Sequence, residues 1–106
     1  MKLGIIVYSN DAETVWNAFR FANFALVMGD EVRAFLVAKG VEWESLDTDK
    51  FNVTEQIQNF LGSKGKIFDC GTCLEIHQLK APERFIVATL KDLYDIVSES
   101  DRIVSF

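Results

Sequence analysis

The feature that most constrains the fold is a regular alternation between short apolar segments and longer segments that begin at helix-capping residues. The chain opens with Lys2–Tyr8, a continuous apolar run that is typical of a strand buried on both faces of a parallel sheet. Further strands are expected at residues 31–37, 66–69, 84–88 and 102–106.

Helix starts are marked by polar residues that can cap a first turn. Asn10, followed by Glu13, has the capping-box spacing and predicts a helix that continues to about Met28. Asn52 and Thr89 predict two more helix starts in the same way. The other helices are expected to cover about residues 52–61, 72–79 and 89–98, and residues 38–51 are expected to form a loop that leaves Trp43 exposed or half-buried.

This alternation predicts one α/β domain over residues 1–106, a three-layer α/β/α structure with a five-stranded, mostly parallel sheet. The common strand order for five such strands is 2-1-3-4-5, with a switch point between the first and third strands. Ligands bind at the carboxyl ends of the strands at such a point. We therefore expect the loop Tyr8–Asp11 to lie beside Cys70.

Charge and hydropathy argue against nucleic acids and membranes as partners. The net charge of −5, with no Lys/Arg cluster, argues against nucleic-acid binding because an acidic surface repels phosphate backbones. No signal peptide is recognised, and the apolar stretch Val15–Met28 is interrupted by polar residues, which argues against a membrane span. We expect a cytoplasmic protein.

Both cysteines lie in the tetrapeptide Cys70-Gly71-Thr72-Cys73, directly after a predicted strand and at a predicted helix start. At that position outward-pointing backbone N–H groups favour thiolate, which is the nucleophilic form of cysteine. The only histidine, His77, lies four residues after Cys73 and would share its helix face, as would Lys80. The candidate site is therefore Cys70, Cys73 and His77, against the alternative that both cysteines are inert packing residues and His77 is a plain surface side chain.

Three other interpretations of the site stay open. The first is thiol–disulfide exchange, in which the motif would face the only proline, Pro82. The second is zinc binding by Cys70, Cys73 and His77, although no second cysteine pair exists. The third is a flavin site on a flavodoxin-like sheet, which the loop Ser9–Thr14 disfavours because it has no glycine to cradle a phosphate. We expect no cofactor and no metal.

The first predicted helix carries more apolar surface than one sheet face can bury. Between residues 15 and 28 its only polar side chains are Asn17, Arg20 and Asn23, at intervals of three. Such an excess favours a subunit interface over scattered exposed aromatic residues, and a symmetric homo-oligomer is the default form.

The segment Asp69-Cys70-Gly71-Thr72-Cys73-Leu74 resembles the active-cysteine loop of the DsrE/DsrF-like family. The first strand, the long Phe- and Ala-rich helix and the closing residues 100–106 are similar to the same family, so the resemblance covers nearly the whole chain. Only the cysteine loop is specific. Basic residues often follow this loop in relatives, and residues 76–80 match them poorly.

The resemblance implies an oligomeric α/β protein, a trimer or hexamer, that relays sulfur as a cysteine persulfide. It places the sulfur on Cys70, with Cys73 as a second cysteine found in part of the family. A protein sulfur donor and a protein acceptor are then implied as partners, and the chain would act as a sulfurtransferase-like carrier. The alternatives are a CxxC redox protein and a non-catalytic oligomeric binding or regulatory module.

Overall fold

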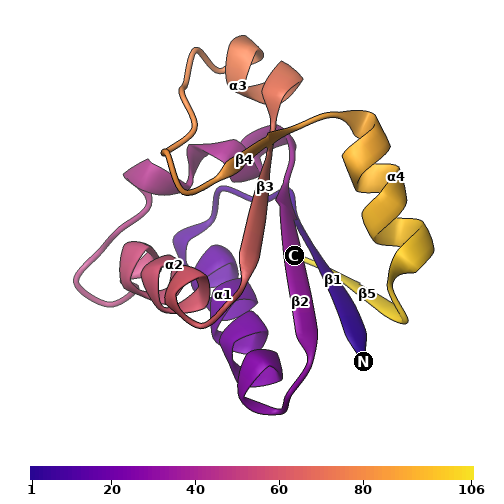
Figure 1. Ribbon diagram of the computed structural model, residues 1–106. Coiled ribbons are helices and arrows are strands. Elements are labelled where there is room, and N and C mark those ends of the chain that lie inside the picture. Colours follow the sequence, from indigo (N-terminus) through magenta and orange to yellow (C-terminus); the bar gives the residue numbers. More distant parts are fainter.

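The computed structural model describes residues 1–106, and its centre is a five-stranded sheet in which all neighbouring strands are parallel (Figure 1). The strands are β1 (Lys2–Val7), β2 (Glu31–Leu36), β3 (Lys66–Cys70), β4 (Ile86–Ala88) and β5 (Arg102–Ser105). The helices are α1 (Ala12–Val27), the 3-10 helix η1 (Ala38–Ser45), α2 (Val53–Gly62), α3 (Gly71–Ile76) and α4 (Leu90–Glu99).

The predicted α/β class is confirmed, but the predicted strand order is wrong. The observed order is β4-β3-β2-β1-β5, whereas the order 2-1-3-4-5 would place β2 at an edge of the sheet. Residues Ala34, Phe35 and Leu36 of β2 are completely buried, as a central strand requires. Strands β1 to β4 are added in one direction across the sheet, and only β5 returns to the other side of β1.

The strand order decides which face each helix covers. Right-handed crossovers that advance in one direction put their helices on the same face, and a crossover in the reverse direction uses the other face. Helices α1 and α2 accordingly pack together on one side of the sheet, and α4 lies on the other (Figure 1).

The strand order also decides which segment lies next to the cysteine loop. Because β2 lies between β1 and β3, the segment after β2, and not the loop Tyr8–Asp11, is adjacent to the end of β3. The prediction that Tyr8–Asp11 lies beside Cys70 is therefore corrected. The backbone N–H of Ala38, the second residue after β2, donates to the Sγ of Cys73 over 3.2 Å.

Two of the three predicted helix caps are confirmed. Asn52 accepts a hydrogen bond from the backbone N–H of Glu55 over 3.0 Å, and Thr89 forms a capping box with Asp92. The first cap is Asp11 and not Asn10, because the Asp11 carboxylate accepts from both the backbone N–H and the hydroxyl of Thr14. These bonds hold the pKa of Asp11 below its usual value.

The segment predicted as an open loop forms η1, and its tryptophan is buried. Trp43 retains only 7% exposure and stacks on Phe85 with ring centroids 5.2 Å apart. Gly40 lets η1 approach β1, since a Cβ at this position would overlap the carbonyl of Val7. The prediction failed because Phe85, which covers Trp43, lies far away in the sequence.

The helix that follows Cys70 is shorter than predicted, and a turn follows it. Helix α3 ends at Ile76, and Gln78 turns the chain with a left-handed φ of 56°. Lys80 therefore lies outside the helix, and the prediction that it shares a helix face with Cys73 is wrong. Strand β4 begins at Ile86 because the preceding residues form a turn in which the N–H of Phe85 donates to the carbonyl of Pro82.

None of the helices combines the length and the apolar character needed to cross a membrane. The apolar residues instead form two buried clusters on the two faces of the sheet. The larger has 19 buried residues, mostly from β1, β2, α1 and α2, and includes the edge-to-face pair Phe19 and Phe60. The smaller, on the α4 face, has four: Phe35, Cys70, Ala88 and Ile96.

Candidate functional site

Cys70 is at once the last residue of β3 and the N-cap of α3. Its Sγ accepts a hydrogen bond from the backbone N–H of Cys73 over 3.4 Å. The side chain is 6% exposed and packs in the smaller cluster with Phe35, Ala88 and Ile96. The sequence places it there because an apolar strand runs directly into the short helix without an intervening loop.

Cys73 is half-buried and lies at the carboxyl edge of the sheet, where it packs against both apolar clusters. Burial, then the hydrogen bond with Cys70, raises the pKa of its thiol. The N–H of Ala38 donates to its Sγ and acts in the opposite direction. Ala38 has a φ of 53°, a left-handed conformation that is uncommon for a residue with a Cβ.

Asp69 is the residue beside the cysteines that sequence reasoning undervalued. It is only 1% exposed, and neither carboxylate oxygen has a hydrogen-bond partner. Burial, with a smaller contribution from the negative charge of Glu44, raises the pKa of Asp69 to about 7. The available signal was an acidic residue inside an otherwise apolar strand, because carboxylates are almost never fully buried without a partner.

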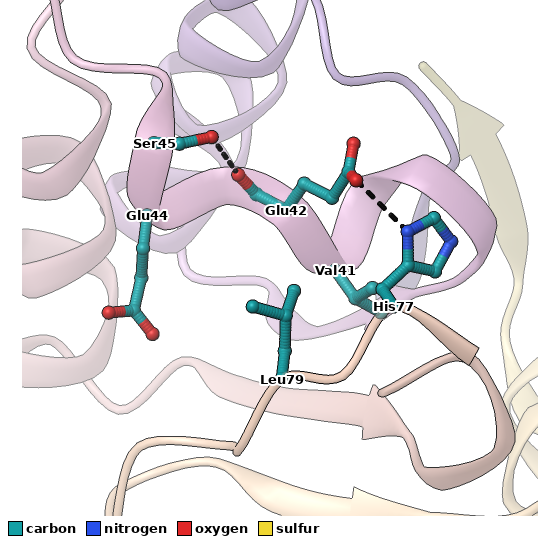
Figure 2. Close-up of a pocket in the computed structure, with 6 residues that line it drawn as sticks. All are labelled: Val41, Glu42, Glu44, Ser45, His77 and Leu79. Atoms are coloured by element: carbon teal, nitrogen blue, oxygen red, sulfur yellow. Dashed lines mark hydrogen bonds and ion pairs between the residues drawn. The ribbon is translucent and has the colours of Figure 1, made fainter. Parts of the chain in front are cut away.

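The side chain of His77 pairs with Glu42 of η1. Its Nδ1 lies 3.0 Å from one Oε of Glu42 (Figure 2). The other Oε of Glu42 accepts from the amide of Asn10 over 2.9 Å. These bonds, that with Asn10 first, hold the pKa of Glu42 below its usual value. His77 thus ties the end of α3 to η1, and the loop predicted beside Cys70 reaches the site only through Asn10.

A shallow cavity of about 230 Å³ lies in front of this ion pair. Its walls come from η1 and from the segment after α3 (Figure 2). The lining residues are Val41, Glu42, Glu44, Ser45, His77 and Leu79. The structure therefore brings Cys70 and Cys73 together and turns the third predicted residue, His77, toward a separate acidic cavity.

No group of three or more His, Cys, Asp or Glu side chains is arranged to hold a metal ion. The three proposed zinc ligands therefore do not converge, since His77 pairs with Glu42. What the pair of cysteines offers chemically is a nucleophilic sulfur beside a second thiol.

Comparison with known proteins places this arrangement in a family. The model of the DsrE/DsrF-like family matches residues 1–106. The chain belongs to the DsrE/DsrF-like family. Uncharacterized proteins of two archaea are similar in sequence to this DsrE-like chain. MJ0989 of Methanocaldococcus jannaschii is 34% identical over 100 residues, 89% of this chain and 88% of that protein. MK0008 of Methanopyrus kandleri is 34% identical over 101 residues, 89% of this chain and 83% of that protein.

Solved structures share the fold of this DsrE-like chain at lower identity. The YchN protein from E. coli aligns over 100% of both chains with a TM-score of 0.84 and 18% identity. The protein of unknown function BT1422 from Bacteroides thetaiotaomicron aligns over 99% of this chain and 94% of its own, with a TM-score of 0.82 and 21% identity. The family resemblance seen in the cysteine loop is thus confirmed over the full length. Membership is consistent with sulfur relay.

Proposed function

We propose that this protein relays sulfur as a persulfide on Cys70 and passes it to a thiol of a partner protein. The observation that carries the proposal is the position of the Cys70 sulfur at the end of β3. There it accepts the backbone N–H of Cys73 at the start of α3. This backbone N–H is a fixed hydrogen-bond donor for the Cys70 sulfur during displacement.

The relay has two displacement steps. The Cys70 thiolate attacks the terminal sulfur of a donor persulfide, the donor's S–S bond breaks, and the donor cysteine leaves as a thiolate. An acceptor thiolate then attacks the terminal sulfur on Cys70, and Cys70 leaves as a thiolate. No external oxidant or reductant is needed, because one S–S bond is exchanged for another in each step.

A partner must reach Cys70, which is only 6% exposed. The cover over the sulfur is thin, because its cluster has only three other buried residues, Phe35, Ala88 and Ile96. On α4, the helix that covers this face, Leu90 and Tyr94 are strongly exposed. These side chains offer an apolar surface that a partner could contact while it displaces the cover.

We also propose that α1 forms a homo-oligomer interface, a trimer or hexamer as the family resemblance implies. Its outer side leaves Phe21, Phe24, Val27 and Met28 exposed. Asn23, one of the three polar residues of this helix, donates its amide to Gln56 of α2. The solvent-facing surface of α1 is therefore more apolar than its sequence indicates, which favours association with a second copy.

The relay is tested by intact-mass measurement after the reduced protein is mixed with inorganic polysulfide and desalted. We expect a gain of one sulfur atom per chain, about 32 Da. Cys70→Ser should abolish the gain. Cys73→Ser is the matched control, since it removes the neighbouring thiol of the same loop and should keep the gain.

Other results would overturn the proposal. If Cys70→Ser still gains sulfur, the carrier is Cys73. If no variant gains sulfur and mild oxidant removes two hydrogens from the wild-type protein, the pair acts as a thiol–disulfide couple. If neither change occurs, the cysteine loop is structural and the protein is a binding or regulatory module.

A further inference from the structure

Asp69 combines three properties that an ordinary core residue does not have. It is buried to 1% exposure, it is a carboxylate, and both of its oxygens lack hydrogen-bond partners. Leaving a buried polar group unsatisfied destabilises the folded state, so such groups are rare in stable cores. Asp69 also directly precedes Cys70, and Cys73 follows one helical turn later. The orphan carboxylate is thus part of the cysteine site.

Cys73 is the thiol that must lose a proton before it can act as a nucleophile. Burial raises its pKa, so that it remains a protonated, weakly nucleophilic thiol near neutral pH. The charge of Asp69 contributes to this rise, which means that the two groups interact electrostatically. Cys73 packs against both apolar clusters, and Asp69 lies on the opposite face of β3 from Cys70. Cys73 therefore lies between the face of Asp69 and the face of Cys70, and its thiol is not hydrogen-bonded to Asp69 in the resting protein.

We propose that Asp69 accepts the thiol proton of Cys73 when Cys73 attacks a persulfide on Cys70, a reaction that releases sulfide and leaves a Cys70–Cys73 disulfide. This inference rests on the proposed function, because it needs a persulfide on Cys70. It gives the site a second outcome: sulfur that no acceptor protein takes is discharged as sulfide.

The atoms and electrons of this step balance. The Cys73 sulfur attacks the Cys70 sulfur, a Cys70–Cys73 bond forms, and the bond between Cys70 and the terminal sulfur breaks. The terminal sulfur leaves with the electron pair of that bond as hydrosulfide and is reduced, while the Cys73 sulfur is oxidised. The proton passes from Cys73 to Asp69 and then to hydrosulfide, which gives hydrogen sulfide. A dithiol reductant reopens the disulfide for another cycle.

The surroundings of Asp69 support a proton acceptor that works near neutral pH. Its register neighbours on the two adjacent strands, Leu36 of β2 and Val87 of β4, carry no charge. From η1, Glu44 contributes a negative charge, which adds to burial in raising the pKa of Asp69 to about 7. From α3, the titratable neighbour is Cys73. The nearest histidine, His77, is paired with Glu42, so no cation neutralises Asp69.

The test follows the decay of the persulfide form. Protein loaded with inorganic polysulfide is desalted and incubated between pH 5 and 9, and intact mass reports the change from the sulfur adduct to a form about 2 Da lighter than reduced protein. In the wild type the rate should rise through a midpoint near pH 7, where Asp69 ionises. Asp69→Asn should slow the decay at pH 7 by about 100-fold and remove that midpoint.

Two further variants keep the result interpretable. Cys73→Ser should hold the persulfide, because the attacking thiol is gone. Glu44→Gln changes an exposed residue outside the cysteine loop and should move the midpoint down by about half a pH unit, an effect that a purely structural role of Asp69 would not produce.

Failure of the inference is distinct from failure of the relay. If the adduct never forms, the proposed function fails. If it forms, and folded Asp69→Asn decays at the wild-type rate with the same pH midpoint, the role of Asp69 is overturned while the relay stands. If Asp69→Asn does not fold, an unchanged midpoint in Glu44→Gln overturns it equally.

Discussion

The two faces of the sheet differ in how firmly they are covered, and β3 sends one reactive side chain to each. Helices α1 and α2 cover one face together and α4 covers the other (Figure 1). By the alternation along β3, Asp69 points to the α1–α2 face and Cys70 to the α4 face. The first face has 19 buried residues in its cluster, and the second has four. The α1–α2 layer is a complete core, whereas the α4 layer is a thin cover.

This difference separates stability from access. A densely packed core resists opening, while a region with few buried contacts opens locally at a lower free energy. Helix α4 leaves Leu90, Tyr94 and Val97 exposed and buries Ile96. Cys70 thus lies under α4, the layer that we expect to open at the lower free energy. Asp69 lies under α1 and α2, the layer that we expect to resist opening.

The largest effects come from two matched truncations. Ile57 of α2 and Ile96 of α4 are both isoleucines in helices and both 1% exposed, but they lie on opposite faces. We expect Ile57→Ala to lower the free energy of unfolding by about 4 kcal/mol and Ile96→Ala by about 2 kcal/mol, because the thin cluster can collapse into the space. Urea denaturation of both variants measures the difference. Equal losses of unfolding free energy in the two variants would show that the two faces of the sheet are packed equally firmly.

Removing the buried charge should stabilise the protein in a pH-dependent way. The pKa of Asp69 is raised in the folded state to about 7, so folding favours its protonated form. Below the unfolded pKa, near 4, both states are protonated and there is no penalty. As pH rises through 7, the folded protein must ionise a buried carboxyl, and stability falls. Asp69→Asn should therefore match the wild type at pH 4 and exceed it at pH 8 by on the order of 2–4 kcal/mol.

Thermal unfolding at several pH values, with urea titrations at pH 4 and 8, tests this expectation. Glu44→Gln is the control, because it keeps the buried carboxyl and should retain most of the pH dependence. A wild-type protein whose stability is flat from pH 4 to 8 would show that Asp69 is solvated, which would weaken its proposed role as well.

A smaller effect is expected where η1 closes the α1–α2 face. Trp43→Phe keeps an aromatic ring against Phe85 but reduces the stacked area, and it should lower the free energy of unfolding by about 1–2 kcal/mol. Tryptophan fluorescence cannot follow this variant as it follows the wild type, so circular dichroism is the common probe. A loss below 0.5 kcal/mol would mean that η1 is not part of the firm face.

The smallest effect belongs to the outer surface of α4. Leu90 is 75% exposed, so Leu90→Ser should change the free energy of unfolding by less than about 0.5 kcal/mol. If this surface contacts a partner, the same change should still weaken sulfur transfer to that partner. A strong destabilisation would show that the α4 layer contributes more to folding than its exposed side chains indicate.

Local signals in the sequence predicted the elements well. The apolar run of β1 and the caps Asn52 and Thr89 act through neighbouring residues, and they appear where expected. The strand order was wrong, because which strands pair depends on contacts between distant segments. Trp43 was misjudged for the same reason, since its burial depends on Phe85.

The site shows the same division. The position of Cys70 at a strand end and helix start follows from its immediate neighbours and was predicted correctly. The pairing of His77 with Glu42 was not predictable, because it depends on the fold of η1. The orphan state of Asp69 could not be read from the sequence either, since a lack of partners is a property of the whole packed surroundings.

The most direct measurement of the central claim is the alkylation rate of each cysteine in the native protein at pH 7, resolved by peptide mass mapping. Cys70 should react faster than Cys73, because burial and the hydrogen bond with Cys70 raise the pKa of Cys73, while Cys70 lies under the thin α4 layer. Ile96→Ala should speed the reaction of Cys70, and Ile57→Ala should not. If Cys73 is modified first, or if Cys70 reacts only as fast as the whole protein unfolds, the claim that Cys70 is the working thiol is contradicted.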